Sequence, residues 1–159
     1  MDYKLKTKNL VKILLATDHA GFELKEVIKT FLTELSYEVE DKGAFEYNSE
    51  DDYPDFIKLA AMSVSQDFEE KKAIIFGGSG QGEAMLANRF KNVRAVVYNT
   101  HNLEIIKLSR EHNDANILSI GARFLLENQT KEAVKLWLET DFSEEERYSR
   151  RIEKVEKLT

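Results

Sequence analysis

The chain has 159 residues, a length typical of one domain with its own core, and we expect a single domain over residues 1–159. Its 23 lysine and arginine residues against 29 aspartate and glutamate residues give a net charge of −6, which argues against nucleic acid as a general partner. The absence of cysteine excludes disulfides, thiolate metal sites and cysteine nucleophiles. The N-terminus is too polar for a signal peptide and no apolar run approaches the length of a membrane span, so we expect a cytoplasmic protein.

Strand-like and helix-like segments alternate along the chain. Short apolar runs predict strands at residues 10–16, 37–40, 73–76, 94–98 and 116–120. Apolar residues at helical spacing predict helices at residues 24–35, 54–64, 84–89, 103–110, 130–138 and 143–157. Pro54 suits the first turn of its helix, and Thr130 is expected to cap the helix that it opens. Ser143 and Glu146 have the spacing of a capping box at the start of the last helix.

This alternation predicts an α/β fold with a five-stranded, parallel, Rossmann-like sheet and helices on both faces, in three layers αβα. Ligands bind such sheets outside the carboxyl ends of the strands. Polar residues gather at these ends, because Asp18 and His19 follow the first strand, residues 78–83 follow the third, and Arg123 follows the fifth. We therefore expect the functional site at this edge of the sheet.

The glycine-rich loop at residues 77–83, Gly-Gly-Ser-Gly-Gln-Gly-Glu, lies between a strand and a helix. Unpaired amides at such a junction favour an anion, and Glu83 adds a carboxylate beside them, which is suited to moving a proton next to a carbonyl. The spacing matches neither the dinucleotide fingerprint nor a P-loop. The simpler alternatives are that the loop is only a tight turn and that Glu83 is a first-turn carboxylate favoured by the helix dipole.

The other polar candidates also have simple alternatives. Asp18 alone would be a helix cap, and His19 and His112 alone would be structural or exposed histidines. The three histidines of the chain have no spacing typical of a metal site, so we expect none. Arg147 and Arg151 are four residues apart and share a helix face. That face is either solvated, with its arginines paired to nearby glutamates, or a clamp for phosphate.

Taken together, the motifs resemble those of ribose-5-phosphate isomerase type B, in the wider family that includes the galactose-6-phosphate isomerase subunits. The resemblance covers residues 11 to 155 and leaves about residues 1–9 as an N-terminal extension. Its motifs, in family order, are Asp18-His19-Ala20-Gly21-Phe22, Asp52-Tyr53-Pro54, Gly77-Gly78-Ser79-Gly80-Gln81-Gly82-Glu83, Ala87-Asn88-Arg89, Ser109-Arg110-Glu111-His112-Asn113-Asp114-Ala115-Asn116 and Gly121-Ala122-Arg123.

The resemblance implies an aldose–ketose isomerase that interconverts ribose 5-phosphate and ribulose 5-phosphate through an enediolate, in the pentose phosphate pathway, without metal or other cofactor. One branch of the family has a cysteine base just before the glycine loop. This chain has Gly77 there, and Glu83 matches the base of the other branch. His112 matches the acid for ring opening, and its place before the fifth strand suggests that it lies near the site. The residues implied to bind substrate are Asp18, His19, Tyr53, Gly78, Ser79, Gly80, Gln81, Gly82, Asn113, Arg123, Arg147 and Arg151.

The resemblance also implies a homodimer, or a dimer of dimers, in which the C-terminal helix reaches the partner subunit and closes its phosphate pocket. Tyr148 stands where some members carry histidine, which leaves the sugar open. One alternative is an isomerase of a six-carbon sugar phosphate, galactose 6-phosphate or allose 6-phosphate. Another is a phosphate- or nucleotide-binding module without catalysis, which would need the loop but not Glu83, His112 or the arginines of the last helix. No nucleic-acid or membrane partner is expected.

Overall fold

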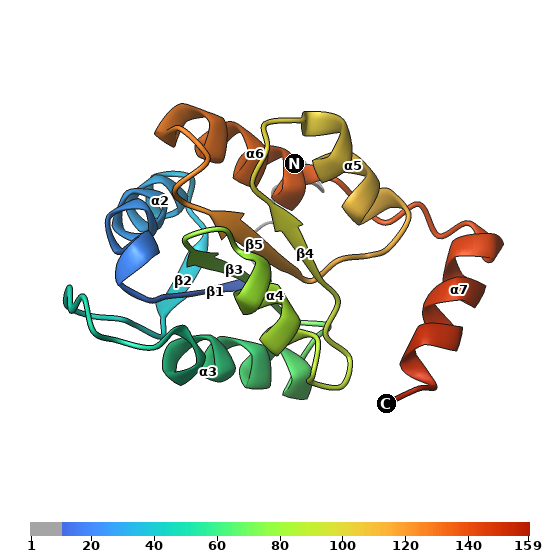
Figure 1. Ribbon diagram of the computed structural model, residues 1–159. Helices are drawn as coiled ribbons and strands as arrows, with labels where there is room; N and C mark the ends of the chain where they lie inside the picture. Colours follow the sequence, from blue (N-terminus) through green and yellow to red (C-terminus); the bar gives the residue numbers. More distant parts are fainter. Residues whose placement is uncertain (1–10) are drawn as a thin grey trace.

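The computed structural model describes residues 11–159, so the expected N-terminal extension lies outside the described residues. The strands and helices alternate as the sequence predicts (Figure 1). In chain order they are β1 (Lys12–Thr17), the 3-10 turn η1 (His19–Gly21), α2 (Phe22–Glu34), β2 (Glu38–Asp41), α3 (Tyr53–Gln66), β3 (Lys71–Gly77), α4 (Gln81–Ala87), β4 (Ala95–Tyr98), α5 (Leu103–Glu111), β5 (Ile117–Gly121), α6 (Glu127–Glu139) and α7 (Glu146–Glu156).

The five described strands form one parallel sheet in the order β2-β1-β3-β5-β4. From β1 the chain moves outward to β2, whereas from β3 it moves in the other direction to β4. The connections after β1 and β3 therefore leave the sheet on opposite faces, because parallel crossovers are right-handed. This divergence makes the carboxyl ends of β1 and β3 a topological switch point, where open α/β sheets bind ligands.

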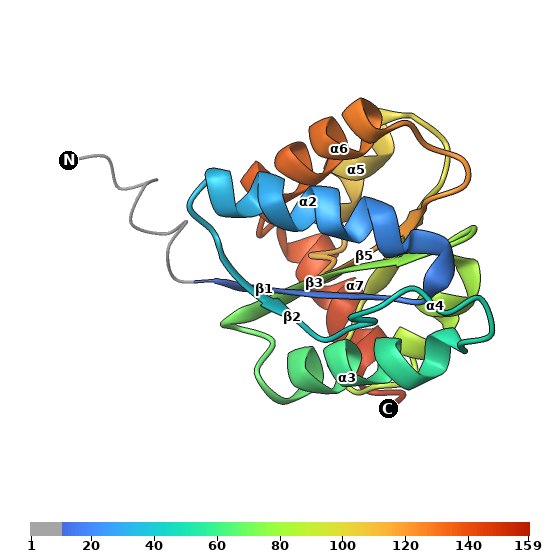
Figure 2. The same cartoon turned by 90° about the vertical axis from the view of Figure 1, so that its left-hand side faces the viewer.

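Helices cover both faces of the sheet, with α2, α5 and α6 on one side and α3 and α4 on the other (Figure 2). β1 shows why its apolar run is continuous. Ile13 and Leu15 belong to the core under the first group of helices, and Leu14 and Ala16 belong to the core under the second. The predicted three-layer αβα fold is confirmed. Among residues 11–159, no helix is long and apolar enough to span a bilayer.

Two helix starts differ from the sequence prediction. α6 begins at Glu127, and Thr130 lies in its first turn with Oγ1 donating to the carbonyl of Leu126, so Thr130 is not the cap. α7 begins at Glu146 rather than at Ser143. Glu144 has a φ of 59°, outside the helical region, and this turn separates Ser143 from the helix. The capping box predicted there is wrong.

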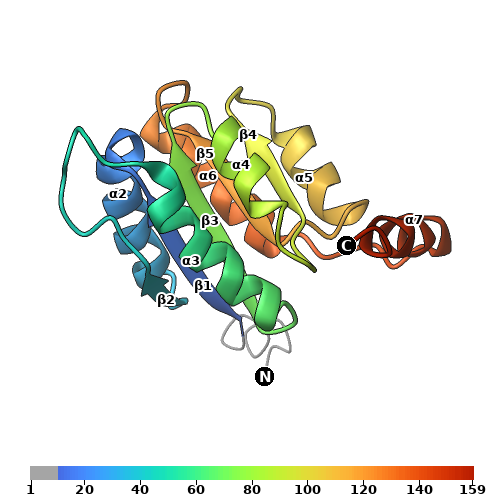
Figure 3. The same ribbon diagram turned by 60° about the horizontal axis from the view of Figure 1, so that its bottom comes forward.

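α7 stands apart from the layers. It lies beyond the β4 edge of the sheet, on the opposite side of the molecule from β2 (Figure 3). Tyr148 is its only buried residue. The helix therefore leaves most of its surface uncovered within one chain.

Candidate functional site

The glycine loop follows β3 at the switch point and is held open by its neighbours. Gly80 has a φ of +78°, a left-handed conformation that side chains disfavour. Ser119 Oγ donates to the carbonyl of Gly80 at 2.6 Å, and Asn99 Nδ2 donates to the carbonyl of Ser79 at 3.0 Å. The amides of Ser79, Gly80 and Gly82 donate to no other residue in the part of the chain that the structure describes. The loop therefore offers backbone donors beside the end of β3.

Glu83 lies in the first turn of α4 and is buried, with 5% of its surface exposed. Its carboxylate occupies the space beside Gly77, where a Cβ would overlap it. Burial raises the pKa of Glu83, its own backbone amide lowers it, and the charge of Asp18 raises it again. The net pKa lies above that of an ordinary glutamate, so burial outweighs the hydrogen bond from the residue's own backbone amide. Such a carboxylate is a better proton acceptor than an exposed one.

Asp18 and His19 follow the end of β1, and His19 contacts the carboxylate of Asp51. Asp18 caps the 3-10 turn, because its Oδ1 accepts from the amide of Ala20 at 3.0 Å. Burial raises the pKa of Asp18. Asp51 Oδ1 lies 2.6 Å from His19 Nδ1, and this contact raises the pKa of His19. Asp18 is thus both the cap expected from the sequence and a wall of the site.

Tyr53 and Arg123 pack against the glycine loop from either side. A Cβ added at Gly82 would lie 2.7 Å from the hydroxyl of Tyr53, and one added at Gly78 would lie 3.3 Å from Arg123 Nη1. The amide of Arg123 also donates to the carbonyl of Gly78 at 3.1 Å. Five parts of the predicted site therefore come together in one chain, namely Asp18, His19, Tyr53, the loop with Glu83, and Arg123.

The remaining predicted residues gather elsewhere. His112 ends α5 and precedes β5, so it lies at the amino end of the parallel sheet, whereas Glu83 follows the carboxyl end of β3. Arg94, which precedes β4, donates to the carbonyl of Asn113 at 3.0 Å. This contact also places Asn113 at the amino ends of the strands. The place of His112 before the fifth strand suggested that it lies near the glycine loop. Within one chain it does not. The physical reason is that strand direction puts the two ends of β5 on opposite edges.

Tyr148 joins α7 to His112. Their rings stack with centroids 4.2 Å apart, and the hydroxyl of Tyr148 lies 2.9 Å from His112 Nε2. The guanidinium carbons of Arg147 and Arg151 lie 4.7 and 5.8 Å from the centre of the Tyr148 ring, so both arginines share a helix face as predicted. Arg147 also pairs with Glu145, while Arg151 forms no ion pair with any described residue. We call His112, Asn113, Arg147, Tyr148 and Arg151 the tail cluster.

A hollow of about 490 Å³ lies between α7 and the body of the chain beside the tail cluster. Asn113 and Arg151 line it from the two sides, and Arg94 binds Glu156 at 2.7 Å across one end. It belongs to the amino edge of the sheet and not to the crevice at the glycine loop.

One group of described residues has the composition of a metal site. Asp18, His19 and Asp51 offer ligand atoms within 4.8 Å of one another. In this arrangement His19 Nδ1 lies 2.6 Å from Asp51 Oδ1, so the ring nitrogen of this group already has a partner without a metal ion.

Sequence reasoning missed three contributors. Ser119 and Asn99 support the loop, and Asp51 holds His19. Ser119 carried a signal, because it is the one hydroxyl within the apolar strand at residues 117–121. Asp51 lies in an irregular polar loop 32 residues from its partner, and nothing in the local pattern connects the two.

Comparisons with known proteins agree with this geometry. A family model described as Ribose/Galactose Isomerase matches residues 13–155. Ribose-5-phosphate isomerase B of Mycolicibacterium paratuberculosis is 36% identical over 143 residues, which are 90% of this chain and 88% of that protein. Ribose-5-phosphate isomerase B of Mycoplasma genitalium, crystallised with bound ribulose-5-phosphate, superposes with a TM-score of 0.90 at 31% identity and covers 94% of this chain and 97% of its own.

The ribose 5-phosphate isomerase of Thermotoga maritima superposes with a TM-score of 0.85 at 37% identity, over 92% of this chain and 98% of its own. The family model and these relatives span the sheet, the glycine loop and the tail alike. The chain belongs to the ribose/galactose isomerase family.

Proposed function

We propose that the chain interconverts ribose 5-phosphate and ribulose 5-phosphate, with Glu83 as the base. The observation that carries the proposal is the buried carboxylate of Glu83 beside a loop of unpaired amides, at the switch point of the sheet. The sugar class is supported by the Mycoplasma genitalium relative, which was crystallised with bound ribulose-5-phosphate. The relatives from Mycolicibacterium paratuberculosis and Thermotoga maritima are also ribose-5-phosphate isomerases.

Isomerisation moves one proton between neighbouring carbons. Glu83 would take the proton from the carbon beside the carbonyl, leaving an enediolate, and return it to the former carbonyl carbon, while the hydroxyl proton passes from one oxygen to the other. One carboxylate serves both steps if its pKa is not far below the working pH. Burial raises the pKa of Glu83 and so moves it in this direction. Losing one preorganised donor to an oxyanion costs on the order of 10²–10³ in rate, so the unpaired amides of Ser79, Gly80 and Gly82 are suited to hold the enediolate oxygen.

We further propose that the working enzyme is a homodimer with sites shared between subunits. One chain brings the base, the loop and Arg123 together, but leaves the tail cluster at the opposite edge of its sheet. A second copy could bring its own tail cluster to the glycine loop of the first. Arg147 and Arg151 would then bind the phosphate, for which forked donors suit better than a point charge. His112 would donate and accept the protons of ring opening, and Asn113 would bind the sugar.

The test is an assay of the purified chain on a panel of aldose and ketose phosphates with five or six carbons, with and without EDTA. We expect turnover of ribose 5-phosphate in preference to galactose 6-phosphate and allose 6-phosphate, unchanged by the chelator. Glu83→Gln keeps the shape and removes the base, so its turnover should fall by about 10²–10⁴ with KM nearly kept. Wild-type turnover in this variant would refute the role of Glu83, and a preference for a hexose phosphate would correct the substrate.

The pH profile provides an independent check on Glu83. A base acts when it is deprotonated, so kcat/KM should rise with pH through the pKa of Glu83. Because burial raises that pKa, the acidic limb should lie above the ordinary glutamate value of about 4.3. An acidic limb at or below this value would contradict the assignment.

A further inference from the structure

His19 is held by a single carboxylate oxygen. Asp51 Oδ1 accepts from the backbone amide of His19 at 3.0 Å and lies 2.6 Å from its ring nitrogen Nδ1. The ring of Tyr47 packs edge-on against the imidazole, with centroids 6.2 Å apart. These contacts fix both the position of the residue and the orientation of its ring.

Asp51 is itself fixed by the fold. It lies in the loop between β2 and α3, and the start of this loop is tied to α2 by Lys25, whose side chain is fully buried. Lys25 Nζ donates to Asp41 at 2.7 Å and to the carbonyl of Ala44 at 2.7 Å. Only 8% of the side chain of Asp51 is exposed. The start of the loop is therefore anchored at Asp41 and Ala44, and the carboxylate of Asp51 is itself shielded from solvent.

The surrounding charges favour a protonated His19. Asp51 Oδ2 is buried and has no hydrogen-bond partner among the described residues, so the imidazole is the only cation with which Asp51 pairs. An unpaired buried carboxylate is costly, and a charged imidazole relieves this cost. Asp18 Oδ2, 4.0 Å from His19 Nδ1, also favours the charged ring, while Arg123 opposes it. The net result is a raised pKa for His19.

This arrangement leaves one ring nitrogen for a ligand. With Nδ1–H bonded to Asp51, Nε2 of a protonated His19 is a donor, and it bonds to no described residue. The side chain remains 24% exposed. Arg123 is close enough for its charge to act on His19, so two cationic donors lie near each other. Two such donors fit an anionic group better than a sugar hydroxyl.

We propose that Asp51 is a positioning residue that holds His19 with Nε2–H presented to the phosphate of the substrate, next to Arg123. The proposal rests on the proposed sugar-phosphate site, and what it adds to that site is the role of Asp51 in holding His19. Asp51 itself touches no substrate. Phosphate binding should weaken as the pH rises through the pKa of His19, because the donor and its charge are then lost.

The first experiment measures the pKa of His19 directly, by NMR titration of the imidazole signals of the full chain. His19→Asn identifies the signal. Asp51→Asn keeps the shape of the side chain and removes its charge, so the pKa of His19 should fall. Asp55→Asn is the matched control, because Asp55 loses the same charge on the neighbouring helix with 70% of its side chain exposed. An unchanged pKa in Asp51→Asn, or an equal fall in Asp55→Asn, would overturn the proposal.

Adding inorganic phosphate extends the same titration. Phosphate should raise the pKa of His19 in the wild type and do so less in Asp51→Asn. A wild-type signal that does not respond to phosphate while the Arg123 signals do would show that His19 does not face the phosphate. This readout needs no turnover, so it stands even if the chain does not isomerise ribose 5-phosphate.

Kinetics separate positioning from a general structural role. The energy of a hydrogen bond to a charged group corresponds to a factor of about 10–100 in a binding constant. Asp51→Asn should therefore raise KM by about that factor, with a smaller change in kcat. In the His19→Asn background the same substitution should add little, because its effect passes through the imidazole. Equal losses in both backgrounds would point to a structural role for Asp51 and contradict the proposal. Inactivity of the wild type would instead refute the proposed function.

Discussion

At Gly77 the absence of a side chain makes room for the carboxylate of Glu83. A Cβ at this position would overlap Oε1 and Cδ of Glu83. The family resemblance implies a branch with a cysteine base at this position, and a cysteine side chain could not share the space with the carboxylate of Glu83. A cysteine at position 77 and the proposed base Glu83 in its present place are therefore mutually exclusive.

Gly77→Ala should consequently displace the carboxylate of Glu83 and reduce turnover toward the level of Glu83→Gln, about 10²–10⁴ below wild type. The backbone of Gly77 is outside the left-handed region, so an alanine is tolerated there except for this overlap. Turnover measured in the single and double variants provides the check. Gly77→Ala should reduce turnover little further in a chain that already carries Glu83→Gln. Full activity in Gly77→Ala would show that the carboxylate works from another position.

Single residues of the site were predictable to different extents. The positions of Glu83 and Arg123 were predictable, because one lies at the start of the helix after β3 and the other in the turn after β5, and the carboxyl ends of parallel strands lie together. Asp51 was not, because its role depends on how an irregular loop folds back over η1. The net direction of the pKa of Glu83 also needed the structure, since it depends on the burial of the carboxylate and on the nearby charge of Asp18.

Among the described residues, two side chains attach α7 to the body of the chain. Tyr148 contributes a ring stacked on His112 and a hydroxyl hydrogen-bonded to it, and Glu156 forms an ion pair with Arg94 at 2.7 Å. The aromatic pair and the hydrogen bond each contribute about 0.5–1.5 kcal/mol. A helix held this weakly is able to adjust when another surface binds it.

Tyr148→Ala should therefore release α7, whereas Tyr148→Phe should keep the stack and lose only the hydrogen bond. Hydrogen exchange of residues 146–156 should be clearly faster in Tyr148→Ala and only slightly faster in Tyr148→Phe. KM for the sugar phosphate should follow the same order, because the arginines of the tail cluster move with the helix. Protection equal to wild type in Tyr148→Ala would mean that other contacts hold α7.

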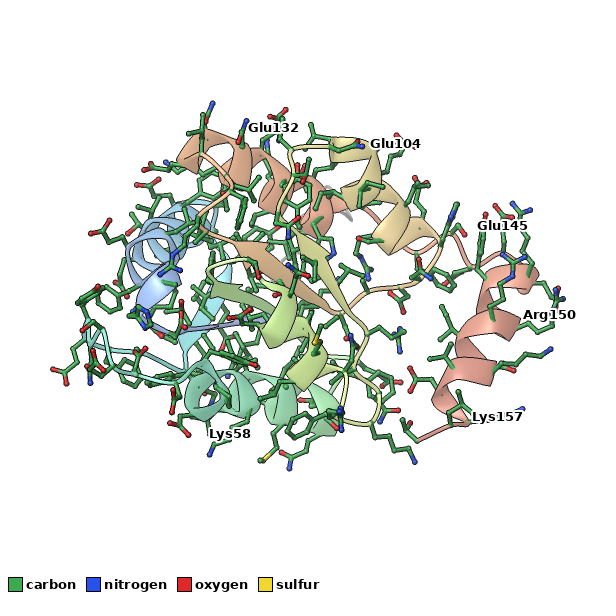
Figure 4. The ribbon with its side chains drawn as sticks, in the orientation of Figure 1. Lys58, Glu104, Glu132, Glu145, Arg150 and Lys157 are labelled. Atoms are coloured by element: carbon green, nitrogen blue, oxygen red, sulfur yellow. The ribbon has the colours of Figure 1, made fainter. Side chains whose placement is uncertain are left out.

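Arg150→Ala is the matched control on the same helix. Arg150 pairs with Glu146 at 2.6 Å and points away from the body of the chain (Figure 4). Its loss should leave both exchange and KM near wild type, because exposed ion pairs contribute little. A large effect of Arg150→Ala on KM would contradict the division of α7 into a functional and a solvated face.

The limits of sequence-based prediction at this scale are visible at the helix starts. The apolar repeat of α6 becomes recognisable only near Thr130, because its first residues are polar and Leu126 is 65% exposed. Ser143 has the residue types of a capping box, but the positive φ of Glu144 removes it from the helix. Periodicity identifies the body of a helix, while its ends depend on local dihedral angles and contacts.

The whole molecule divides the predicted site between two edges of one sheet. The direction of the strands was predictable, and so was the gathering of residues at the carboxyl ends. The separation of His112 from Glu83 also follows from parallel strands, since a residue before β5 must lie at its amino end. The strand order and the position of α7 could not be predicted from local sequence patterns, because they depend on tertiary packing.

A mixed dimer tests whether two chains complete one site. One subunit carries Glu83→Gln, and the other carries Arg147→Ala together with Arg151→Ala. The subunits bear different affinity tags, so that sequential purification isolates the mixed species and mass spectrometry verifies it. Each variant alone should be weakly active, because every site of either homodimer has one defect.

If the arginines act on the partner's site, one site of the mixed dimer receives both defects and the other receives none. About half of the wild-type activity should then return, with a wild-type KM, because the intact site combines the Glu83 of one chain with the arginines of the other. If the arginines act within their own chain, each site keeps one defect and activity stays as low as in the homodimers. Since α7 leaves most of its surface uncovered and the tail cluster lies at the edge opposite Glu83, we expect recovery. A verified mixed dimer without recovered activity would rule out the shared site.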